Sequence, residues 1–423
     1  MSEVSSALRP SHVPDAPPTA VGVLDVEDPT LVRFPVTPIA ARHRRLRVMV
    51  RRDGRPLGFV EVAAEAGAWD PVALAEQVDL LALSATGSAP TGPAVPTVPA
   101  VPTVPTEPDP MSVVVCTRDR AELLRRSLTS ILDQAGAQTE LVVVDNAPRT
   151  SATRDVVDSL DDARIRYVLE PRPGLSVARN VGMAHASHEL VAFTDDDVVA
   201  DPDWLVGLSR AARHGDAGCL TGSVPTGQLE SSVQHFFERR VDWSGQLEPQ
   251  LFLRHDTHRG PLYPFSPGIF GTGANFAITQ SAYRQVGPFD ERLGAGRRTK
   301  GGEDLDYFFR LIWAGIGIRY EPSAMVWHIH RPDEAAYRDQ VLGYGIGYGA
   351  FATKLALTPR WAVSFARRVP RGAWMLRRAM KTAVDGHGLP PEFTRLERRG
   401  MVRGPIELAR EHLDGLRRTG RLR

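Results

Sequence analysis

The stretch ELVAFTDDDVVADPDW, residues 189–204, places three aspartates in a row directly after a short apolar run. The apolar run is typical of a buried strand, and the aspartates come where that strand would end. Adjacent carboxylates repel one another, so a fold that keeps Asp195, Asp196 and Asp197 together needs a positive charge nearby. A metal ion or a substrate would supply that charge, and a hydrated surface turn would do without it. The stretch alone leaves these three explanations open.

Strand-like runs alternate with helical patterns on both sides of this stretch. The strand-like runs cover 111–116, 140–145, 164–170 and 189–194, and the helical patterns cover 119–134 and 174–187. This alternation predicts an α/β fold with a parallel sheet and helices on both faces. Ligands of such sheets bind beyond the carboxyl ends of the strands. Polar residues follow three of the predicted strands, at 117–120, at 145–146 and at the triplet, so we expect a site at this edge.

The composition excludes several classes of protein. The 423 residues are 42% hydrophobic, enough for a globular core, and the 51 basic residues nearly cancel the 50 acidic ones. Nothing global therefore indicates a nucleic-acid partner. Two cysteines cannot build a disulfide framework or an all-cysteine metal site, and they fit a reducing compartment. Neither a signal peptide nor a run of about 20 apolar residues is evident, so we expect a cytoplasmic protein.

Changes in composition along the chain predict five zones. The first zone is rich in Pro, Ser and Ala, and the second contains a hairpin pattern with Asp53 and Gly54 in its turn. The third is nearly repetitive in proline and is expected to be extended. The zones are a disordered N-terminus over 1–20, a small α+β domain over 21–83, a linker over 84–110, the main domain over 111–335 and a basic helical extension over 336–423.

The triplet has two competing chemical interpretations. In extended chain Asp195 and Asp197 point the same way, so together they can hold Mg²⁺ or Mn²⁺ with help from a substrate phosphate. A phosphatase of the haloacid-dehalogenase type would instead use Asp195 as a phosphorylated nucleophile. Those aspartates usually follow a first strand, however, and three predicted strands precede the triplet here.

Further candidate residues lie downstream. In GTGANFAI, Gly273 lets backbone amides approach a ligand and Asn275 can bridge donors and acceptors, although a tight turn before a strand also explains them. The loop 296–302 is rich in Gly and basic residues, which predicts a flexible lid over phosphates. It leads into a helix that begins near Glu303, where Glu303, Asp304 and Asp306 each suit either a base or a cap.

A strand pattern then ends in two histidines. His328 and His330 occupy alternate positions of the strand and therefore face one side of it. One of the two is the natural candidate for a metal ligand. The segment 343–357 that follows is interrupted by glycines and is expected to pack as a helix near the acceptor side.

Together these motifs resemble the inverting family-2 glycosyltransferases of GT-A fold. The likeness covers about 111–335 and rests on seven motifs in order: SVVVCTRDR, LVVVDNA, GLSVARNVGMAHA, FTDDDV, GTGANFAI, GGEDLDYFFRL and VWHIHR. It implies a GT-A type nucleotide-sugar-binding sheet, a UDP- or dTDP-sugar donor, a saccharide or lipid-linked acceptor and a divalent metal, Mn²⁺ or Mg²⁺. The first loop departs from the family, because CTRDR stands where many members have Pro-Thr-x-Asn-Arg.

The resemblance also implies roles for single residues. They are Thr117 and Arg120 in the nucleoside pocket, Asp145 at the base or ribose, Arg179 near the diphosphate, Asp195, Asp196 and Asp197 in the Asp-x-Asp motif, Gly273 and Asn275 in an acceptor-side loop, Glu303 at the acceptor, Asp304 as general base, and His328 as a metal contact with His330 as second choice. On this interpretation the positive partner of the triplet is a bound cation rather than a side chain.

The C-terminal extension carries a further hypothesis. Trp361, Phe365, Trp374 and Met375 are interspersed with arginines, which suits peripheral attachment to an anionic membrane at its inner face as well as it suits a helix packed on the main domain. A membrane-bound enzyme would take a lipid-linked sugar or another envelope precursor as acceptor. A catalytically silent scaffold is disfavoured, because every motif keeps its charged residue.

Overall fold

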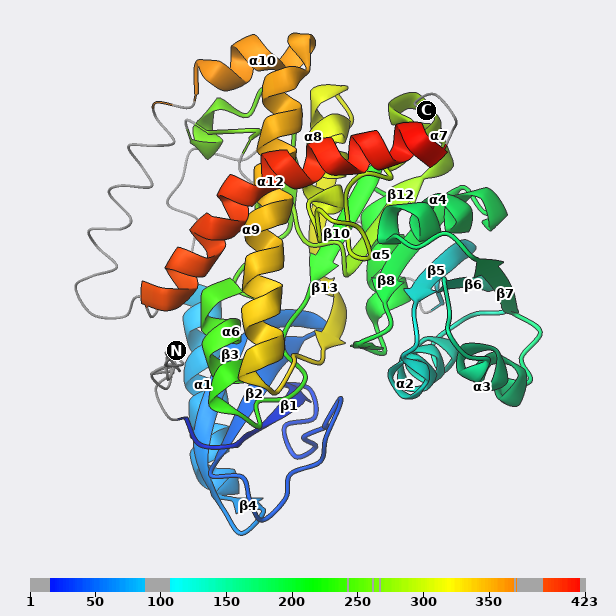
Figure 1. Ribbon diagram of the computed structural model, residues 1–423. Helices are drawn as coiled ribbons and strands as arrows, with labels where there is room; N and C mark the ends of the chain where they lie inside the picture. The colour runs from blue at the N-terminus through cyan, green and yellow to red at the C-terminus, as the bar shows by residue number, and fades with distance from the viewer. Residues whose placement is uncertain are drawn as a thin grey trace, which may run out of the picture.

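The computed structural model describes residues 16–87, 107–241, 243–260, 262–265, 268–368, 370 and 391–418. Within these ranges the strands form a nine-stranded central sheet and a separate four-stranded sheet. Figure 1 shows the small sheet beside one end of the central sheet, with the long C-terminal helices crossing the other side.

The elements follow one another along the chain as follows. The small sheet and its helix comprise β1 (Thr19–Asp25), β2 (Arg45–Arg52), β3 (Arg55–Glu65), β4 (Ala68–Trp69) and α1 (Pro71–Gly87). The first half of the central sheet and its helices comprise β5 (Met111–Thr117), α2 (Ala121–Leu132), β6 (Thr139–Asn146), α3 (Ala152–Leu160), β7 (Ile165–Glu170), α4 (Leu175–His185), β8 (Leu190–Asp195), β9 (Val198–Ala200) and α5 (Trp204–Ala212). The second half comprises β10 (Cys219–Ser223), α6 (Ser232–Val241), β11 (Gln250–Phe252), η1 (Thr257–Arg259), β12 (Asn275–Thr279), α7 (Gln280–Val286), α8 (Glu303–Trp313) and β13 (Ile318–His328). The extension comprises α9 (Glu334–Leu357), α10 (Pro359–Ala366) and α12 (Pro391–Arg418).

The central sheet has the parallel arrangement that the sequence predicts for its first four strands. Its order is β11-β13-β10-β12-β8-β5-β6-β7, and β5 pairs in parallel with both β6 and β8. The chain therefore changes direction across the sheet between β5 and β8, which is where an open α/β sheet forms a crevice. In the ladders Thr117 lies opposite Asp145, and Cys116 lies opposite Asp195, so the polar strand ends meet at one edge.

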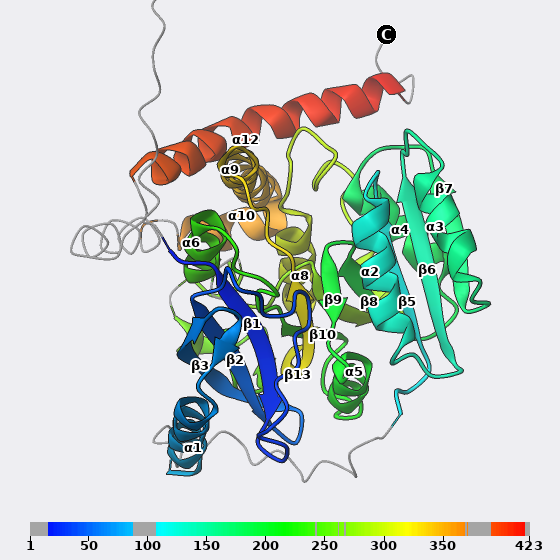
Figure 2. The same ribbon diagram turned by 90° about the horizontal axis from the view of Figure 1, so that it is seen from below.

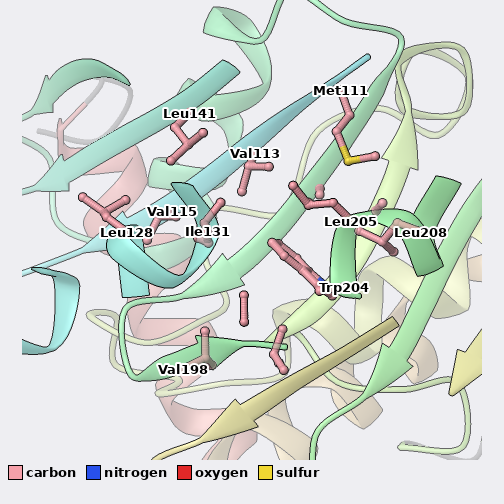
Figure 3. Close-up of a cluster of buried hydrophobic side chains, with 14 of the residues drawn as sticks. Met111, Val113, Val115, Leu128, Ile131, Leu141, Val198, Trp204, Leu205 and Leu208 are labelled. Carbon is pink, nitrogen blue, oxygen red and sulfur yellow. The ribbon is translucent and has the colours of Figure 1, made fainter. Parts of the chain in front are cut away.

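Side chains alternate between the two faces of each central strand, and this builds two cores. Val113 and Val115 of β5 pack against α2, α3 and α5, a cluster drawn in Figure 3. Val114 of the same strand packs with Phe193 and with α4 and α8 on the other face. Both faces of β5 are covered, and this explains why its valines are consecutive and do not alternate with polar residues.

The small N-terminal domain contains the predicted hairpin. β2 and β3 are antiparallel, and Asp53 and Gly54 both have positive φ in the turn between them. β1 begins at Thr19, inside the segment expected to be disordered, because backbone hydrogen bonds to β2 order it as a strand. Most of the predicted linker, 88–106, lies outside the described residues.

The extension is helical, as predicted, and part of it packs on the main domain. The segment 343–357 is helical as expected and belongs to α9. Trp361, however, is 2% exposed and meets Phe309 edge-on, so it is a core residue and not an interfacial one. Trp374 and Met375 lie outside the described residues. No helix in the described ranges has the length and apolar character needed to cross a bilayer.

Candidate active site

A cavity of about 1390 Å³ opens at the carboxyl ends of β5 and β8. Its walls come from the ends of β5, β8 and β13, the start of α4, the loops before β12 and α8, and the side of α9. Most of the predicted site residues line it, namely Thr117, Arg120, Arg179, Asp195, Asp196, Asp197, Gly273, Glu303, Asp304 and His328.

The acidic triplet forms a turn and not an extended segment. β8 ends at Asp195 and β9 begins at Val198, so the alternation assumed for extended chain does not hold at Asp196 and Asp197. Asp196 faces the protein, where its carboxylate accepts hydrogen bonds from Thr117 Oγ1 at 2.7 Å and from Arg120 Nη1 at 2.9 Å. These two residues, predicted for a nucleoside pocket, therefore hold the turn as well as lining the cavity.

Side chains supply the positive charge that the triplet needs. Arg120 Nη1 also donates to Asp197 Oδ2 at 3.0 Å, and His328 Nε2 lies 3.4 Å from Asp197 Oδ1. Arg179 Nη2 lies 3.7 Å from Asp195 Oδ1. The prediction that a bound cation alone offsets the triplet is wrong, because the protein already places cationic groups on all three carboxylates.

These surroundings separate the acidities of the triplet. Burial raises the pKa of Asp195 to about 7, with Arg179 opposing the rise and Asp197 adding to it. Burial would also raise the pKa of Asp197, yet His328 and Arg120 together hold it below the ordinary value. Negative charge is therefore concentrated on Asp197. A cation beside Asp195 would favour the ionised form of Asp195.

The two histidines belong to one series of contacts, in which His328 contacts His330 and His330 contacts Glu238. His328 Nδ1 lies 2.8 Å from His330 Nδ1, and His330 Nε2 lies 3.3 Å from Glu238 Oε2. Both nitrogens of His330 are thus occupied, and the residue does not line the cavity. His330 is consequently wrong as a second metal contact, whereas His328 Nε2 faces the triplet.

The residues present fit a divalent cation in one specific way. Within the described residues no three His, Cys, Asp or Glu side chains form a group that could hold a metal by themselves. Asp197 Oδ1 is nevertheless buried without a hydrogen-bond partner, and it faces His328 Nε2. Mg²⁺ and Mn²⁺ are commonly held by one or two carboxylates together with substrate phosphates, so Asp197 and His328, with Asp195 beside them, match that type of site.

Arg179 joins the triplet to the start of α8. It is 2% exposed, and its guanidinium donates to Glu303 Oε1 at 3.1 Å and to the Gly273 carbonyl at 2.9 Å. Burial raises the pKa of Glu303 to about 6; Asp304 adds to the rise and Arg179 opposes it. Because Glu303 is committed to Arg179, it is a structural neighbour of the site and poorly placed to take a proton from an acceptor.

Asp304 is held differently from Glu303. Its Oδ2 accepts from the Gly273 amide at 3.2 Å, and its Oδ1 accepts from the Leu305 amide at 2.8 Å. A side chain at Gly273 would put its Cβ 2.9 Å from Arg179 Nη2 and 3.3 Å from Asp304 Cβ, so it would displace the Arg179 guanidinium. The Leu305 amide lies in the first turn of α8 and the Gly273 amide lies in the loop before β12, and together they orient the carboxylate toward the cavity.

Two predicted residues lie away from the cavity. Asp145 is fully buried and accepts a hydrogen bond from the Tyr167 hydroxyl at 2.8 Å, which places it under the sheet edge. Asn275 is also fully buried, where it accepts from Trp204 Nε1 and donates to the carbonyls of Ser223 and Ala324. Asn275 therefore holds strands together. The sequence-based prediction that it faces an acceptor is wrong.

The loop 296–302 is anchored more firmly than a flexible lid. Its Arg298 amide donates to Glu411 Oε1 at 2.8 Å, and Arg298 Nε donates to Asp414 Oδ2 at 3.0 Å, both on α12. Arg297 and Lys300 of the loop still line the cavity. The loop is thus a fixed wall of the cavity. Its Arg298 faces α12.

Sequence reasoning missed several cavity residues. Arg331, which directly follows the histidine pair, is an exposed cation that lowers the pKa of Asp197. Trp243 meets His328 edge-on at 5.8 Å, and Tyr344 of α9 forms part of the opposite wall. A basic residue after a strand end was a usable signal for Arg331, but nothing in the sequence brings Trp243 or Tyr344 to the triplet.

The sheet order and the acidic turn at its crevice define the central domain as one of GT-A type. Residues 112–287 match the family model described as glycosyl transferase family 2, and this part of the chain belongs to that family.

Two curated relatives and one solved structure illustrate the likeness. The chain is 31% identical over 277 residues to validoxylamine A glucosyltransferase of Streptomyces hygroscopicus subsp. jinggangensis (strain 5008), which covers 60% of this chain and 64% of that protein. It is 31% identical over 247 residues to pre-mycofactocin glycosyltransferase of Mycobacterium tuberculosis (strain ATCC 25618 / H37Rv), which covers 58% of this chain and 47% of that protein. The mannosyltransferase PcManGT from Pyrobaculum calidifontis, solved in complex with GDP-Man and Mn²⁺, shares 17% identity with a TM-score of 0.42 over 73% of this chain and 89% of its own. The chain spans less than two thirds of the length of these two curated relatives.

Proposed function

We propose that the protein is an inverting glycosyltransferase that moves a sugar from a nucleoside diphosphate to an acceptor hydroxyl with the help of a divalent metal. The observation that carries the proposal is the sharing of one cavity by Asp197 and His328, which suit a metal, and by Asp304, which suits a base. The names of the two relatives, a glucosyltransferase and a glycosyltransferase, support the same reaction class.

Each part of the proposed site has a task. Asp197 and His328, with Asp195 beside them, would hold Mn²⁺ or Mg²⁺, which when bound stabilises the charge on the diphosphate leaving group. Arg120 and Arg331 face the same part of the cavity and attract the phosphates of the donor.

Asp304 takes the proton of the acceptor hydroxyl while the acceptor oxygen bonds to the anomeric carbon. The bond from that carbon to the diphosphate oxygen breaks in the same step, and the nucleoside diphosphate leaves with the electron pair. Attack from the face opposite the leaving group inverts the anomeric configuration. One base is sufficient for this reaction, which agrees with the commitment of Glu303 to Arg179.

The base is tested by Asp304→Asn, which keeps the shape of the side chain and removes its basicity. We expect the turnover number to fall roughly 100- to 10,000-fold, because general base catalysis contributes about that much. Donor affinity, measured by calorimetry with the nucleoside diphosphate, should stay unchanged.

Asp155→Asn is a matched control, since Asp155 is also a carboxylate in the first turn of a helix but lies on α3. Near-normal turnover in purified Asp304→Asn would show that another group is the base.

The donor and acceptor are identified by a screen. UDP and dTDP stay predictions of the sequence, so the screen measures nucleoside diphosphate release from a panel of nucleotide sugars with Mn²⁺, with Mg²⁺ and with EDTA. Full activity in EDTA would remove the metal from the proposal. The haloacid-dehalogenase alternative is not favoured, because the triplet follows the fourth strand of the sheet; release of phosphate from a simple monoester would revive it.

A further inference from the structure

The outward face of α12 is an exposed surface of unusual composition. Figure 2 shows α12 lying along one edge of the molecule, outside α9. Its exposed residues are arginines, a histidine and small or apolar residues: Arg395, Arg398, Arg399, Val402, Arg403, Pro405, Ile406, Ala409, Arg410, His412, Leu413 and Arg417. We refer to these residues as the α12 outer face.

The acidic residues of α12 are sorted to the opposite side. Glu392 pairs with Arg338 and Glu397 pairs with Arg240, so both carboxylates fasten the helix to the rest of the protein. Asp414 does the same with Arg298. As a result, no fully exposed carboxylate lies on this helix in the part that the structure describes.

Asp414 also lies 3.9 Å from Arg417 of the outer face, and two more of its arginines contact Glu407. Glu407 is 5% exposed, and it lies 3.4 Å from Arg403 Nη2 and 3.1 Å from Arg410 Nη1. Among the described residues, no carboxylate pairs with Arg395 or Arg399, so the first half of the α12 outer face carries most of the uncompensated charge.

An apolar ridge runs between these arginines. Val402 is 74% exposed, Ile406 is 52% exposed and Leu413 is 46% exposed. Positions 402, 406, 409 and 413 are three or four residues apart and therefore lie on one side of the helix. Branched aliphatic side chains flanked by arginines are the composition of helices that lie in the surface of a bilayer.

We propose that the α12 outer face docks on an anionic lipid bilayer, with the apolar ridge in the headgroup region and the arginines on lipid phosphates. The charge of the face is complementary to anionic lipid, and its exposed residues extend from Arg395 to Arg417 along α12.

Docking in this way places the catalytic cavity next to the membrane. The inner side of α12 contributes Glu397 and Met401 to the cavity wall, so one helix touches both the proposed bilayer and the proposed site. Resting on the proposed function, this arrangement selects an acceptor that is anchored in lipid and presents its hydroxyl at the surface.

The test is co-sedimentation of the full chain with vesicles of phosphatidylcholine alone and of phosphatidylcholine with phosphatidylglycerol. We expect binding only to the anionic vesicles, weakening as salt rises. The double variant Arg395→Gln/Arg399→Gln should lower the partition coefficient by about tenfold or more, since each arginine near an anionic surface contributes roughly fivefold. Val402→Ser/Ile406→Ser should lower it as well, which pure charge attraction would not explain.

Arg126→Gln/Arg154→Gln is the charge-matched control on α2 and α3, and it should bind as the wild type does. Wild-type binding by both α12 variants, or equal binding to both kinds of vesicle, would overturn the proposal. A dimer in solution that Val402→Ser/Ile406→Ser disperses would overturn it in favour of a second copy of the chain. Donor turnover without vesicles is measured in parallel, so that a failure of docking and a failure of the proposed transfer reaction are told apart.

Discussion

Glu238 lies outside the cavity, yet its contacts determine which nitrogen of His328 faces the triplet. As a carboxylate it can only accept a hydrogen bond, so His330 must carry its proton on Nε2. His330 Nδ1 is then an acceptor, and His328 Nδ1 must donate to it. This leaves His328 Nε2 to face Asp197, which is the arrangement that a metal ligand needs.

The first residue-scale prediction concerns this chain of hydrogen bonds. Glu238→Leu removes the acceptor, frees the tautomer of His330 and should weaken Mn²⁺ affinity about 10- to 100-fold, the usual effect of losing a partner behind a metal-binding histidine. Affinity is measured on folded protein by electron paramagnetic resonance of free Mn²⁺, with and without nucleoside diphosphate.

Two further variants separate this role from packing. Glu238→Gln keeps an acceptor and should retain most of the affinity. Ser244→Ala removes only the hydroxyl that lies 3.4 Å from Glu238 Oε1 and should change the affinity little. Equal Mn²⁺ affinity in Glu238→Leu and wild type would show that the chain of contacts does not orient His328.

At the scale of elements, glycines let α9 and α12 cross with their backbones in contact. A Cβ at Gly349 of α9 would lie 2.2 Å from the Met401 carbonyl oxygen, and one at Gly404 of α12 would lie 2.5 Å from the Ala350 amide nitrogen. The opposite side of α9 meets the cavity loop, where a Cβ at Gly347 would lie 2.5 Å from the Gly301 carbonyl carbon. The glycine-interrupted pattern of this helix therefore serves close packing on two sides.

Gly349→Ala tests this packing. Alanine favours the helix by about 1 kcal/mol, but forcing the two backbones apart costs about 1–3 kcal/mol or more, so a net loss of stability is expected. Thermal melting reports the loss, and limited proteolysis should show earlier cleavage of α12.

Gly415→Ala is the control, because a Cβ there meets nothing within 4 Å and α12 should gain stability. A Gly349→Ala protein as stable as Gly415→Ala would mean that the helices can separate without cost.

At the scale of the whole molecule, a buried arginine links the small sheet to the central domain. Arg51 of β2 is 2% exposed; its Nη1 donates to Asp201 Oδ1 at 2.6 Å, and its Nε donates to Asp25 Oδ1 at 2.8 Å. Asp201 is fully buried and also accepts from Trp327 Nε1 at 3.0 Å. Trp327 adjoins His328, so the N-terminal sheet supports the strand that carries the candidate metal ligand.

Arg51→Met should therefore destabilise the protein strongly. It leaves the Asp201 carboxylate buried without its cation, and breaking a buried pair in this way costs about 3–5 kcal/mol. The free energy of unfolding is measured by urea denaturation.

Arg33→Met is the comparison, because Arg33 pairs with the same Asp25 but is 38% exposed. Its loss should cost less than about 1 kcal/mol. Similar small effects of the two substitutions would show that the small sheet is not held through Arg51.

Local patterns predicted much of this molecule because they act over a few residues. The Val-rich runs of β5 and β6 are typical of strands covered on both faces, and Asp53-Gly54 is typical of a hairpin turn, since both properties follow from side-chain shape and backbone freedom. Family motifs then identified Asp304 and the triplet as site residues. The roles of these residues stay predictions until the variants are measured.

The sequence by itself determined the alternation of strands and helices, the position of the acidic turn and the family of residues 112–287, because these depend on patterns along the chain. Only the tertiary structure decided which side chains meet there. Arg120, Arg179 and His328 come to the triplet from three different elements, while Asn275 turns inward to clamp strands. Such contacts between distant segments depend on how the elements pack, and charge and burial in the assembled cavity then set the acidity of each carboxylate.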